Sequence, residues 1–172
     1  TIGRVDLRNE VIFTIDGDDT KDIDDAISIK KVSNDVYELG VHIADVSHYV
    51  KKDSVIDEDA FERGTSVYLV DRVIPMLPHK LSNGICSLNP NVDRLALSCV
   101  MNINTKGYVI SYKIFKSVIR SRKQMTYNCV NQILEKDIVP VGYEEFVNDL
   151  KLMKELSNIL RKKMVNHGYL EF

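Results

Sequence analysis

Residues 14 to 26 read Thr14-Ile15-Asp16-Gly17-Asp18-Asp19-Thr20-Lys21-Asp22-Ile23-Asp24-Asp25-Ala26, a stretch that carries six aspartates and one lysine within ten residues. Apolar residues alternate before it from Val11 and resume after it at Ile27 and Ile29, which predicts a strand on each side. Because Ile15 and Ile27 anchor the loop to a core, several carboxylates are forced close together. Such a cluster is stable only when protons or hard cations offset the repulsion.

Further alternation of apolar residues predicts a largely antiparallel sheet. Residues 37–43 alternate cleanly after the turn-forming pair Asn34-Asp35, and residues 95–103 give another strand. A turn at Lys106-Gly107 then leads into a long strand over residues 108–122. The apolar phase of this strand shifts near Phe115, which predicts a β-bulge at that point.

Helical patterns follow. Residues 54–64 predict a short helix with a cap at Asp53 or Ser54, and Thr126 is expected to cap a helix that ends near Lys136. A long amphipathic helix begins at Tyr143 and stops at Gly168. Its apolar stripe is predicted to be core and consists of Phe146, Leu150, Met153, Leu156, Leu160 and Met164.

The order of these elements defines the expected fold class, which is α+β (mixed α/β), with a largely antiparallel sheet and helices following it. We expect a β-rich part over residues 1–125 and a helical part over residues 126–172. No apolar run approaches the roughly 20 residues needed to span a bilayer, so a membrane protein is not expected.

The formal net charge of the 172 residues is −2, which by itself weighs against a nucleic-acid partner. The charge is segregated, however, since residues 16–25 carry −5 and the remainder sums to +3. Residues 94–134 hold seven basic side chains and no acidic one: Arg94, Lys106, Lys113, Lys116, Arg120, Arg122 and Lys123. This basic stretch is either the solvated face of a strand pair or a track for phosphates. We favour RNA contact for part of it.

Three cysteines, Cys86, Cys99 and Cys129, are an odd number at wide spacing, without zinc-type pairs. This usage is typical of a reducing cytoplasm and argues against a disulfide framework. No apolar h-region follows Thr1, so a secretory signal is not expected. The chain starts at Thr1 and stops at Phe172 directly after a helical segment, so we expect a fragment of a longer protein.

Three interpretations of the acidic loop compete. An EF-hand loop that starts at Asp16 would need Gly and Glu where Lys21 and Ile27 stand, and its flanks would be helices. A magnesium site for phosphodiester chemistry requires a few carboxylates together with water and substrate phosphate. A solvated acidic turn would need no ligand at all. Spacing disfavours the EF-hand and does not decide between the other two.

Longer motifs decide the matter by resemblance. Phe13 to Asp16 and Asp22 to Ala26 are followed by His42-Ile43-Ala44-Asp45-Val46-Ser47-His48-Tyr49-Val50 and Arg63-Gly64-Thr65-Ser66-Val67-Tyr68-Leu69. Further blocks are Arg72-Val73-Ile74-Pro75-Met76-Leu77-Pro78, Leu81-Ser82-Asn83-Gly84, Cys86-Ser87-Leu88-Asn89-Pro90 and Asp93-Arg94-Leu95-Ala96. These blocks resemble the RNB catalytic domain of the ribonuclease II / ribonuclease R family, and their sequence is closer to the ribonuclease R type. The resemblance spans most of residues 4–130 and is weak after about residue 136.

The resemblance implies processive 3′-to-5′ hydrolysis of single-stranded RNA to nucleoside 5′-monophosphates, with Mg²⁺ and with Mn²⁺ as a possible substitute. It places the four active-site aspartates, which are also the metal ligands, at Asp16, Asp22, Asp24 and Asp25. By this analogy Asp16 and Asp25 hold one ion, Asp22 helps through water, and Asp24 serves the second ion and the attacking water. Asp18 and Asp19 are expected to face solvent.

The resemblance also implies that aromatic rings stack on the last nucleotides of the RNA, with Tyr68 and Phe172 in those positions. A tyrosine in a strand is ordinarily a packing residue. Stacking on a base is tolerant of sequence and suits a non-specific exonuclease, at roughly 1–3 kcal/mol per base.

The four histidines, His42, His48, His79 and His167, are scattered without partners at ligand spacing, and structural roles are expected for His42 and His48. The segment Asp45-Val46-Ser47-His48 lacks a nucleophile elbow. The chain is therefore interpreted as the N-terminal part of an RNB domain, without the rest of that domain or its flanking RNA-binding domains. The implied partner is a single-stranded RNA 3′ end in the cytoplasm, with neither DNA nor a membrane. The alternative is an RNA- or metal-binding fragment without catalytic activity, and the fragment alone is expected to be inactive.

Overall fold

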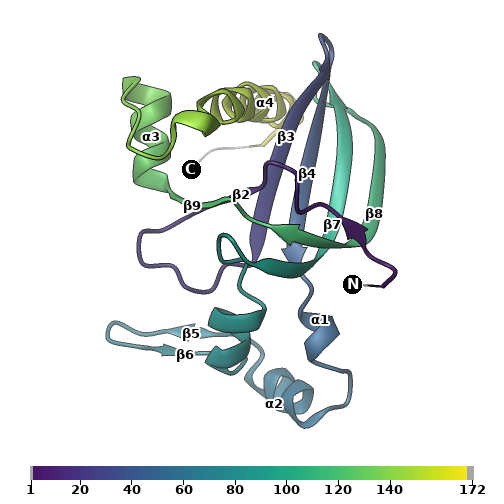
Figure 1. The fold of residues 1–172 in the computed structure, drawn as a ribbon, viewed down its shortest axis with the longest axis vertical. Helices are drawn as coiled ribbons and strands as arrows, with labels where there is room; N and C mark the ends of the chain where they lie inside the picture. Colours follow the sequence, from purple (N-terminus) through teal and green to yellow (C-terminus); the bar gives the residue numbers. More distant parts are fainter. Residues whose placement is uncertain (1, 170–172) are drawn as a thin grey trace.

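The computed structural model describes residues 2–169, and its centre is a curved seven-stranded sheet (Figure 1). The strands lie in the order β1-β8-β7-β4-β3-β2-β9. Their bounds are β1 Val5–Asp6, β2 Phe13–Asp16, β3 Asp25–Ser33, β4 Val36–Ala44, β7 Asp93–Asn104, β8 Val109–Arg120 and β9 Lys123–Thr126. All neighbouring pairs are antiparallel except β1 with β8 and β2 with β9, which are parallel.

The chain between β4 and β7 leaves the sheet and forms a smaller lobe below it (Figure 1). This lobe contains helices α1 (Val46–Tyr49) and α2 (Val55–Arg63), the hairpin of β5 (Val67–Tyr68) and β6 (Val73–Ile74), and the π-helical turn η1 (Lys80–Ile85). After β9 come α3 (Tyr127–Lys136), the short 3₁₀ helix η2 (Glu144–Phe146) and α4 (Val147–Asn166). The expected mixed fold with a mostly antiparallel sheet is therefore confirmed.

The sheet buries apolar side chains on both faces. On one face Phe13, Met125, Ile133, Phe146 and Leu150 form a core between β2, β9 and the helices α3 and α4. On the opposite face a separate core gathers at the lower end of the sheet, and it consists of Ile12, Ile23, Ala26, Ala44, Leu88, Ala96 and Ile119. None of the helices within residues 2–169 is both long and apolar enough to cross a membrane.

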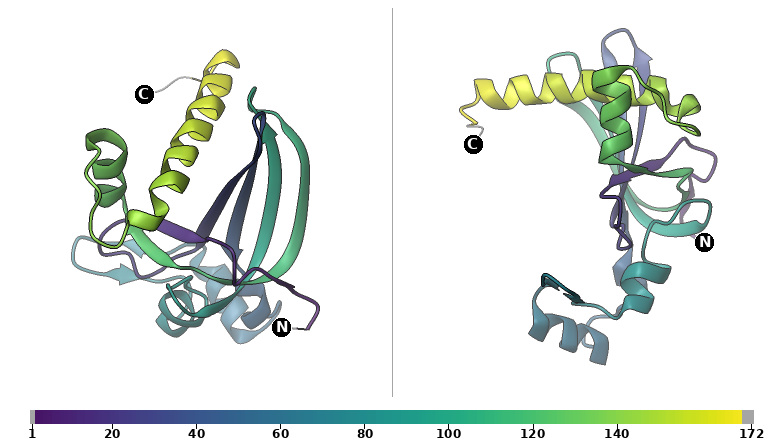
Figure 2. Two further views of the ribbon diagram at one scale, coloured as in Figure 1. Left: turned by 45° about the horizontal axis from the view of Figure 1, so that its top comes forward. Right: turned by 90° about the vertical axis from the view of Figure 1, so that its left-hand side faces the viewer.

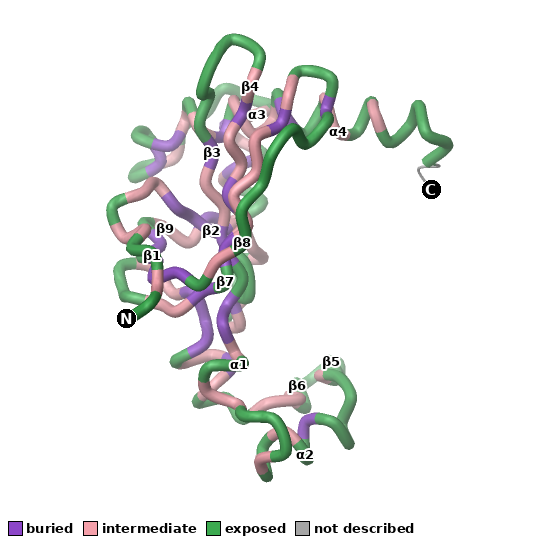
Figure 3. Tube along the Cα trace, turned by 90° about the vertical axis from the view of Figure 1, so that its right-hand side faces the viewer, coloured by how far each residue is buried: buried purple, intermediate pink, exposed green. Residues whose placement is uncertain are grey.

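Helix α4 covers only part of the face on which it lies. Its residue Leu156 packs with Ile29, Tyr37 and Ile103 at the turn end of the strands. Farther along the same face Ile114 remains 61% exposed, because α4 does not reach it. The C-terminal end of α4 and the β5–β6 hairpin both project to the same side of the sheet, which gives the molecule a concave side (Figures 2 and 3).

Several local predictions are confirmed. Ser54 caps α2 by accepting a hydrogen bond from the Asp57 amide, and Gly64 ends this helix with a φ of 70°. Thr126 Oγ1 accepts from the Cys129 amide at 3.3 Å and caps α3. Two residues, Asn34 and Asp35, connect β3 to β4.

The bulge predicted near Phe115 is wrong, because the register of β7 with β8 shifts between Asn102 and Ile103 instead. The apolar phase changes for another reason: Ser117, Val118 and Ile119 are all buried, so this end of β8 is covered on both faces. The α4 stripe is also not core throughout, since Met164 near the C-terminal end of the helix is 48% exposed.

Candidate functional site

The acidic loop is held by one serine at its centre. Ser87 Oγ accepts from the Ile23 amide at 3.1 Å and donates to the Lys21 carbonyl at 2.9 Å. The Leu88 amide donates to the Ile23 carbonyl at 2.9 Å, and the Ile23 side chain is fully buried. The segment between Asp22 and Asp24 is therefore fixed in position against the core although its neighbours are charged.

Strands position the two ends of the loop. Asp16 is the last residue of β2 and lies opposite Thr126 of the parallel strand β9. Asp25 begins β3 opposite Ile43, and the Ala44 amide donates to the Asp24 carbonyl at 2.9 Å. Asp16 ends β2 and Asp25 begins the antiparallel neighbour β3, so their carboxylates lie at the same end of these two strands.

The carboxylates influence each other's ionisation. Partial burial raises the pKa of Asp24, and the charges of Asp22, Asp25 and Asp16 raise it further. Burial likewise raises the pKa of Asp16, with a further contribution from Asp25. The four predicted aspartates therefore share one electrostatic site, in which full ionisation is unfavourable unless positive charge is supplied.

The donor atoms of this site suit a hard cation. Asp16 Oδ2 is buried and has no hydrogen-bond partner within the described residues, and such an orphaned anionic oxygen is costly without a counter-charge. Carboxylate oxygens are the ligands that Mg²⁺ prefers. Within residues 2–169, no three His, Cys, Asp or Glu side chains converge in the geometry of a complete metal site. The aspartates therefore fit a cation in their charge and donor atoms, and not in a complete ligand geometry.

A cleft of about 860 Å³ separates the acidic loop from the β5–β6 hairpin, and these two segments face each other in Figure 1. Residues 17–22 form one wall, and Tyr68, Arg72 and His79 contribute to the other. The Tyr68 side chain is 72% exposed, so its ring is available to a ligand in the cleft. Of the four predicted aspartates, Asp22 lines this cleft directly.

Two residues of the cleft, Arg72 and His79, were not assigned a role from the sequence. Burial raises the pKa of Asp22, and the nearby His79 partly opposes that increase. Arg72 has an ion pair only with its exposed neighbour Asp71, at 3.7 Å, among the contacts of the described chain. Both cleft residues fall in or beside motif blocks of the sequence, which is the signal that could have identified them.

Asp18 and Asp19 are exposed, as expected, and both lie along the cleft wall. Asp18 accepts a hydrogen bond from Asn128 Nδ2 at 2.8 Å. Phe172, the second predicted stacking ring, lies outside the described residues.

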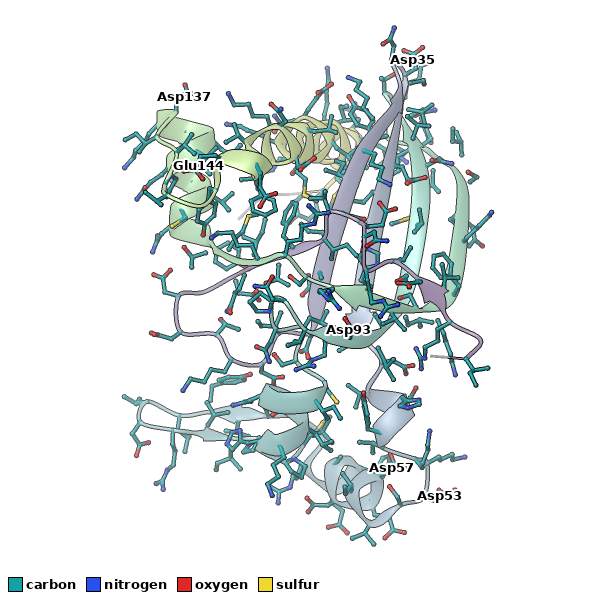
Figure 4. All side chains as sticks on the ribbon, in the orientation of Figure 1. Asp35, Asp53, Asp57, Asp93, Asp137 and Glu144 are labelled. Carbon is teal, nitrogen blue, oxygen red and sulfur yellow. The ribbon has the colours of Figure 1, made fainter. Side chains whose placement is uncertain are left out.

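Much of the basic stretch serves the fold. Arg94 donates to the Ser87 carbonyl at 2.7 Å and to the Gly84 carbonyl at 3.1 Å, so it holds η1 at the edge of the cleft. Arg120 pairs with Asp93, which Figure 4 labels at the start of β7. The Lys123 ammonium lies 4.4 Å from the centre of the Tyr143 ring. Arg94, Arg120 and Lys123 therefore have partners within the fold, and contact with RNA phosphates is not needed to explain why these positions are basic.

Comparison with known proteins gives consistent matches. The RNB domain model matches residues 4–172. Ribonuclease R 1 of Lactococcus lactis is 53% identical over 172 residues, which are 99% of this chain and 21% of that protein. Ribonuclease R of Thermotoga maritima is 54% identical over 167 residues, which are 97% of this chain and 24% of that protein.

Among solved structures, Mycoplasma genitalium RNase R in complex with ribose methylated single-stranded RNA superposes with a TM-score of 0.93 at 33% identity. That match covers 99% of this chain and 27% of the other. The chain thus spans about a fifth to a quarter of the length of the curated relatives it matches.

Proposed function

Because this chain belongs to the RNB-domain family of exoribonucleases, we propose that it forms the acidic part of the active site of a ribonuclease R-type enzyme. The proposed reaction is processive 3′-to-5′ hydrolysis of single-stranded RNA, with release of nucleoside 5′-monophosphates. The observation that carries this proposal is the single electrostatic site made by Asp16, Asp22, Asp24 and Asp25 beside a cleft.

These four aspartates would hold Mg²⁺, or Mn²⁺ in its place, in a two-metal arrangement. Divalent ions at such a site supply charge neutralisation and activation of water. The chain itself supplies the framework: the Ser87 hydrogen bonds keep the acidic loop in place, and the strand ends bring Asp16 and Asp25 together. Asp24 has the most carboxylate neighbours acting on its pKa, which supports its role as the residue most sensitive to substitution.

The cleft residues would bind and orient the RNA end. The exposed Tyr68 ring offers a stacking surface for a terminal base, and every base has such a face. Arg72 offers a fixed positive charge to a phosphate on the same wall. Neither contact reads base identity, which suits an enzyme that degrades RNA of any sequence.

A second candidate function is RNA or metal binding without turnover. It is favoured by the fraction of the relatives that this chain covers, 21% for the Lactococcus lactis protein. We propose that the 172 residues alone bind metal and RNA but cleave little or none.

The three cysteines are all unpaired, which supports the cytoplasm as the location of this protein.

The test is a chimera in which these 172 residues replace the matching segment of Lactococcus lactis ribonuclease R 1. We expect the chimera to release mononucleotides from a labelled single-stranded RNA when Mg²⁺ is present. Asp24→Asn should reduce the rate more than about 100-fold, because even groups that only support metal ligands contribute 10–100-fold. Asp19→Asn removes the same charge from an exposed position of the same loop and should change little.

An active Asp24→Asn chimera would remove the catalytic assignment. A chimera as active as the relative, with the isolated chain inactive, would support the enzyme over the binding module. A chimera that folds and binds RNA but never cleaves would favour the second candidate function.

A further inference from the structure

A basic pocket lies far from the acidic cleft, where the β7–β8 turn meets the C-terminal half of α4. It has a volume of about 520 Å³, and its polar and aromatic lining includes Lys106, Tyr108, Lys162, Lys163, Asn166 and His167. We call it the turn pocket. The function proposed above makes no use of it.

The turn pocket is built by specific contacts. Lys163 Nζ donates to the Gly107 carbonyl at 2.9 Å and lies 4.0 Å from the centre of the Tyr108 ring. Gly107 has a φ of +76°, and a Cβ there would approach Lys163 Cδ to 3.2 Å. The tight turn and the helix are therefore fitted to each other, and Lys163 is fixed between them.

Two other lysines of the pocket are available to a ligand. Among residues 2–169, Lys106 and Lys162 are exposed, and neither ammonium group has a hydrogen bond or an ion pair there. Other lysines of α4 differ, because Lys151 pairs with Asp137 and Lys154 pairs with Glu135.

Within residues 2–169, no Asp or Glu lines the pocket. An acidic residue does stand on the neighbouring β3–β4 turn, where the Asp35 carbonyl accepts from the Thr105 amide at 3.2 Å (Figure 4). The single carboxylate of Asp35 does not offset the charges of the three pocket lysines, so the net charge around the pocket is positive. The pocket therefore attracts anions, and the half-exposed Tyr108 ring adds a surface for an aromatic group.

We propose that the turn pocket binds the phosphodiester backbone of an RNA strand whose 3′ end lies in the acidic cleft. This inference rests on the function proposed above. Lys106 and Lys162 would contact phosphates, and Tyr108 would contact a sugar or base. Basic side chains that alternate with an aromatic ring are typical of non-specific single-strand binding.

The sheet gives the spacing between the two sites. Asp25 pairs with Ile43 at one end of β4, and Val36 pairs with Asn104, next to the turn, at the other end. Seven residue steps at about 3.3 Å each separate the two levels by about 23 Å. At about 3.4 Å per stacked nucleotide this distance corresponds to about seven nucleotides. The end of α4 and the β5–β6 hairpin project to the same side, so one strand can reach both (Figure 3).

The experiment measures binding of fluorescent single-stranded RNA to the 172-residue chain by anisotropy, without divalent cations. The test variant is Lys106→Gln/Lys162→Gln. The matched control is Lys52→Gln/Lys136→Gln, which removes two exposed charges outside the turn pocket. RNAs of about four and about sixteen nucleotides are compared, since only the longer one can span about seven nucleotides.

For the longer RNA we expect the test variant to bind more weakly and to lose about 1.4 from the salt slope, or about 0.7 per phosphate contact. Between about 50 and about 200 mM salt, its affinity should therefore fall about sevenfold less than that of the unsubstituted chain. The shorter RNA should bind both chains equally.

An equal change in the control variant, or an equal loss for both RNA lengths, would overturn the proposal. So would competition by poly-glutamate that matches RNA at equal charge, because the pocket would then accept any polyanion, including an acidic protein. The proposed function is tested separately by the Asp24→Asn chimera, whose activity does not depend on these lysines when the substrate is about four nucleotides long.

Discussion

Arg4 Nη2 lies 2.5 Å from Asp45 Oδ2, and only 6% and 5% of the two side chains are exposed. Arg4 also donates to the carbonyls of Ala96 and Ser117, at 3.3 Å each. The N-terminal segment is thereby attached to the ends of β4, β7 and β8, next to the lobe that carries Tyr68. This buried ion pair joins the sheet to the segment that leads into the cleft wall.

Arg4→Ala should destabilise the chain strongly, because it leaves the Asp45 carboxylate buried and unpaired. Loss of one partner of a buried pair costs about 3–5 kcal/mol of unfolding free energy. Urea denaturation measures the change. Arg8→Ala, on the same segment, breaks only exposed pairs with Asp6 and Asp93 and should have a much smaller effect. Equal effects of the two substitutions would contradict the importance of burial here.

The buried His42 side chain should make the fold less stable in mild acid. The imidazole is buried between Ser28 Oγ at 3.1 Å and Ser98 Oγ at 2.7 Å, and burial lowers its pKa from 6.5 to about 4. The unfolded chain therefore binds this proton more readily than the folded chain. Stability is complete above the unfolded pKa and is lost as pH falls from 6.5 toward 4, by an amount on the order of 3 kcal/mol.

The pH dependence of His42 is measured by urea denaturation between those two values, with His42→Gln for comparison. The difference in unfolding free energy between the two chains should shrink as the pH falls. Nuclear magnetic resonance of the imidazole in the unsubstituted chain gives an independent reading. An imidazole that titrates near its ordinary pKa in the folded chain would show that the prediction is wrong.

Mg²⁺ should stabilise the chain through the acidic cluster. Burial raises the pKa values of Asp16, Asp22 and Asp24, so the folded state holds these protons more tightly than the unfolded state. The metal-free fold therefore loses stability as pH rises from the ordinary carboxyl pKa through the raised values. A cation that binds only the folded state at about 100 times its Kd adds about 2.7 kcal/mol.

Thermal unfolding at neutral pH, with and without Mg²⁺, measures this effect. Asp24→Asn should raise the metal-free Tm, because it removes repulsion, and should reduce the gain from Mg²⁺. Asp19→Asn is the matched control and should keep the full gain. An identical gain in all three chains would remove the metal-site assignment.

Tyr68→Ala should alter the product and not abolish cleavage. In the chimera, loss of the ring removes roughly 1–3 kcal/mol of stacking on a terminal base, so short RNAs should dissociate earlier and the final product should lengthen. Tyr68→Phe retains the ring and should retain the product. Tyr112→Ala removes a similarly exposed ring from β8, outside the cleft, as the control. An unchanged product for Tyr68→Ala would count against stacking.

Features with local causes could be predicted from the sequence. The caps at Ser54 and Thr126 follow from neighbouring backbone donors, and strand alternation reports a buried face directly. The prediction of a bulge near Phe115 was wrong because apolar alternation cannot distinguish a bulge from a strand that is buried on both faces. The prediction that Met164 is core was wrong because the apolar stripe continues to the C-terminal end of α4, where this side chain stays half-exposed.

The acidic site was accessible to sequence reasoning because all four aspartates lie within ten residues and a short loop must keep them together. Of its surroundings within the described residues, the family resemblance indicated Tyr68 but neither Arg72 nor Ser87. The cleft needs Tyr68 and Arg72 opposite the loop, and the loop needs the Ser87 hydroxyl between Lys21 and Ile23. These contacts join segments that are distant in the chain, and no local propensity encodes them.

By itself, the sequence determined the long strands, the helices α2, α3 and α4, the acidic cluster and the family of this protein, because periodicity, capping and motif order are properties of neighbouring residues. Only the tertiary structure decided which residues face the acidic cluster and where the exposed lysines of the turn pocket lie. The parallel pairing of β2 with β9, the Arg4–Asp45 ion pair and the turn pocket all depend on long-range packing. Their physical cause is burial between distant segments, which exists only once the chain has folded.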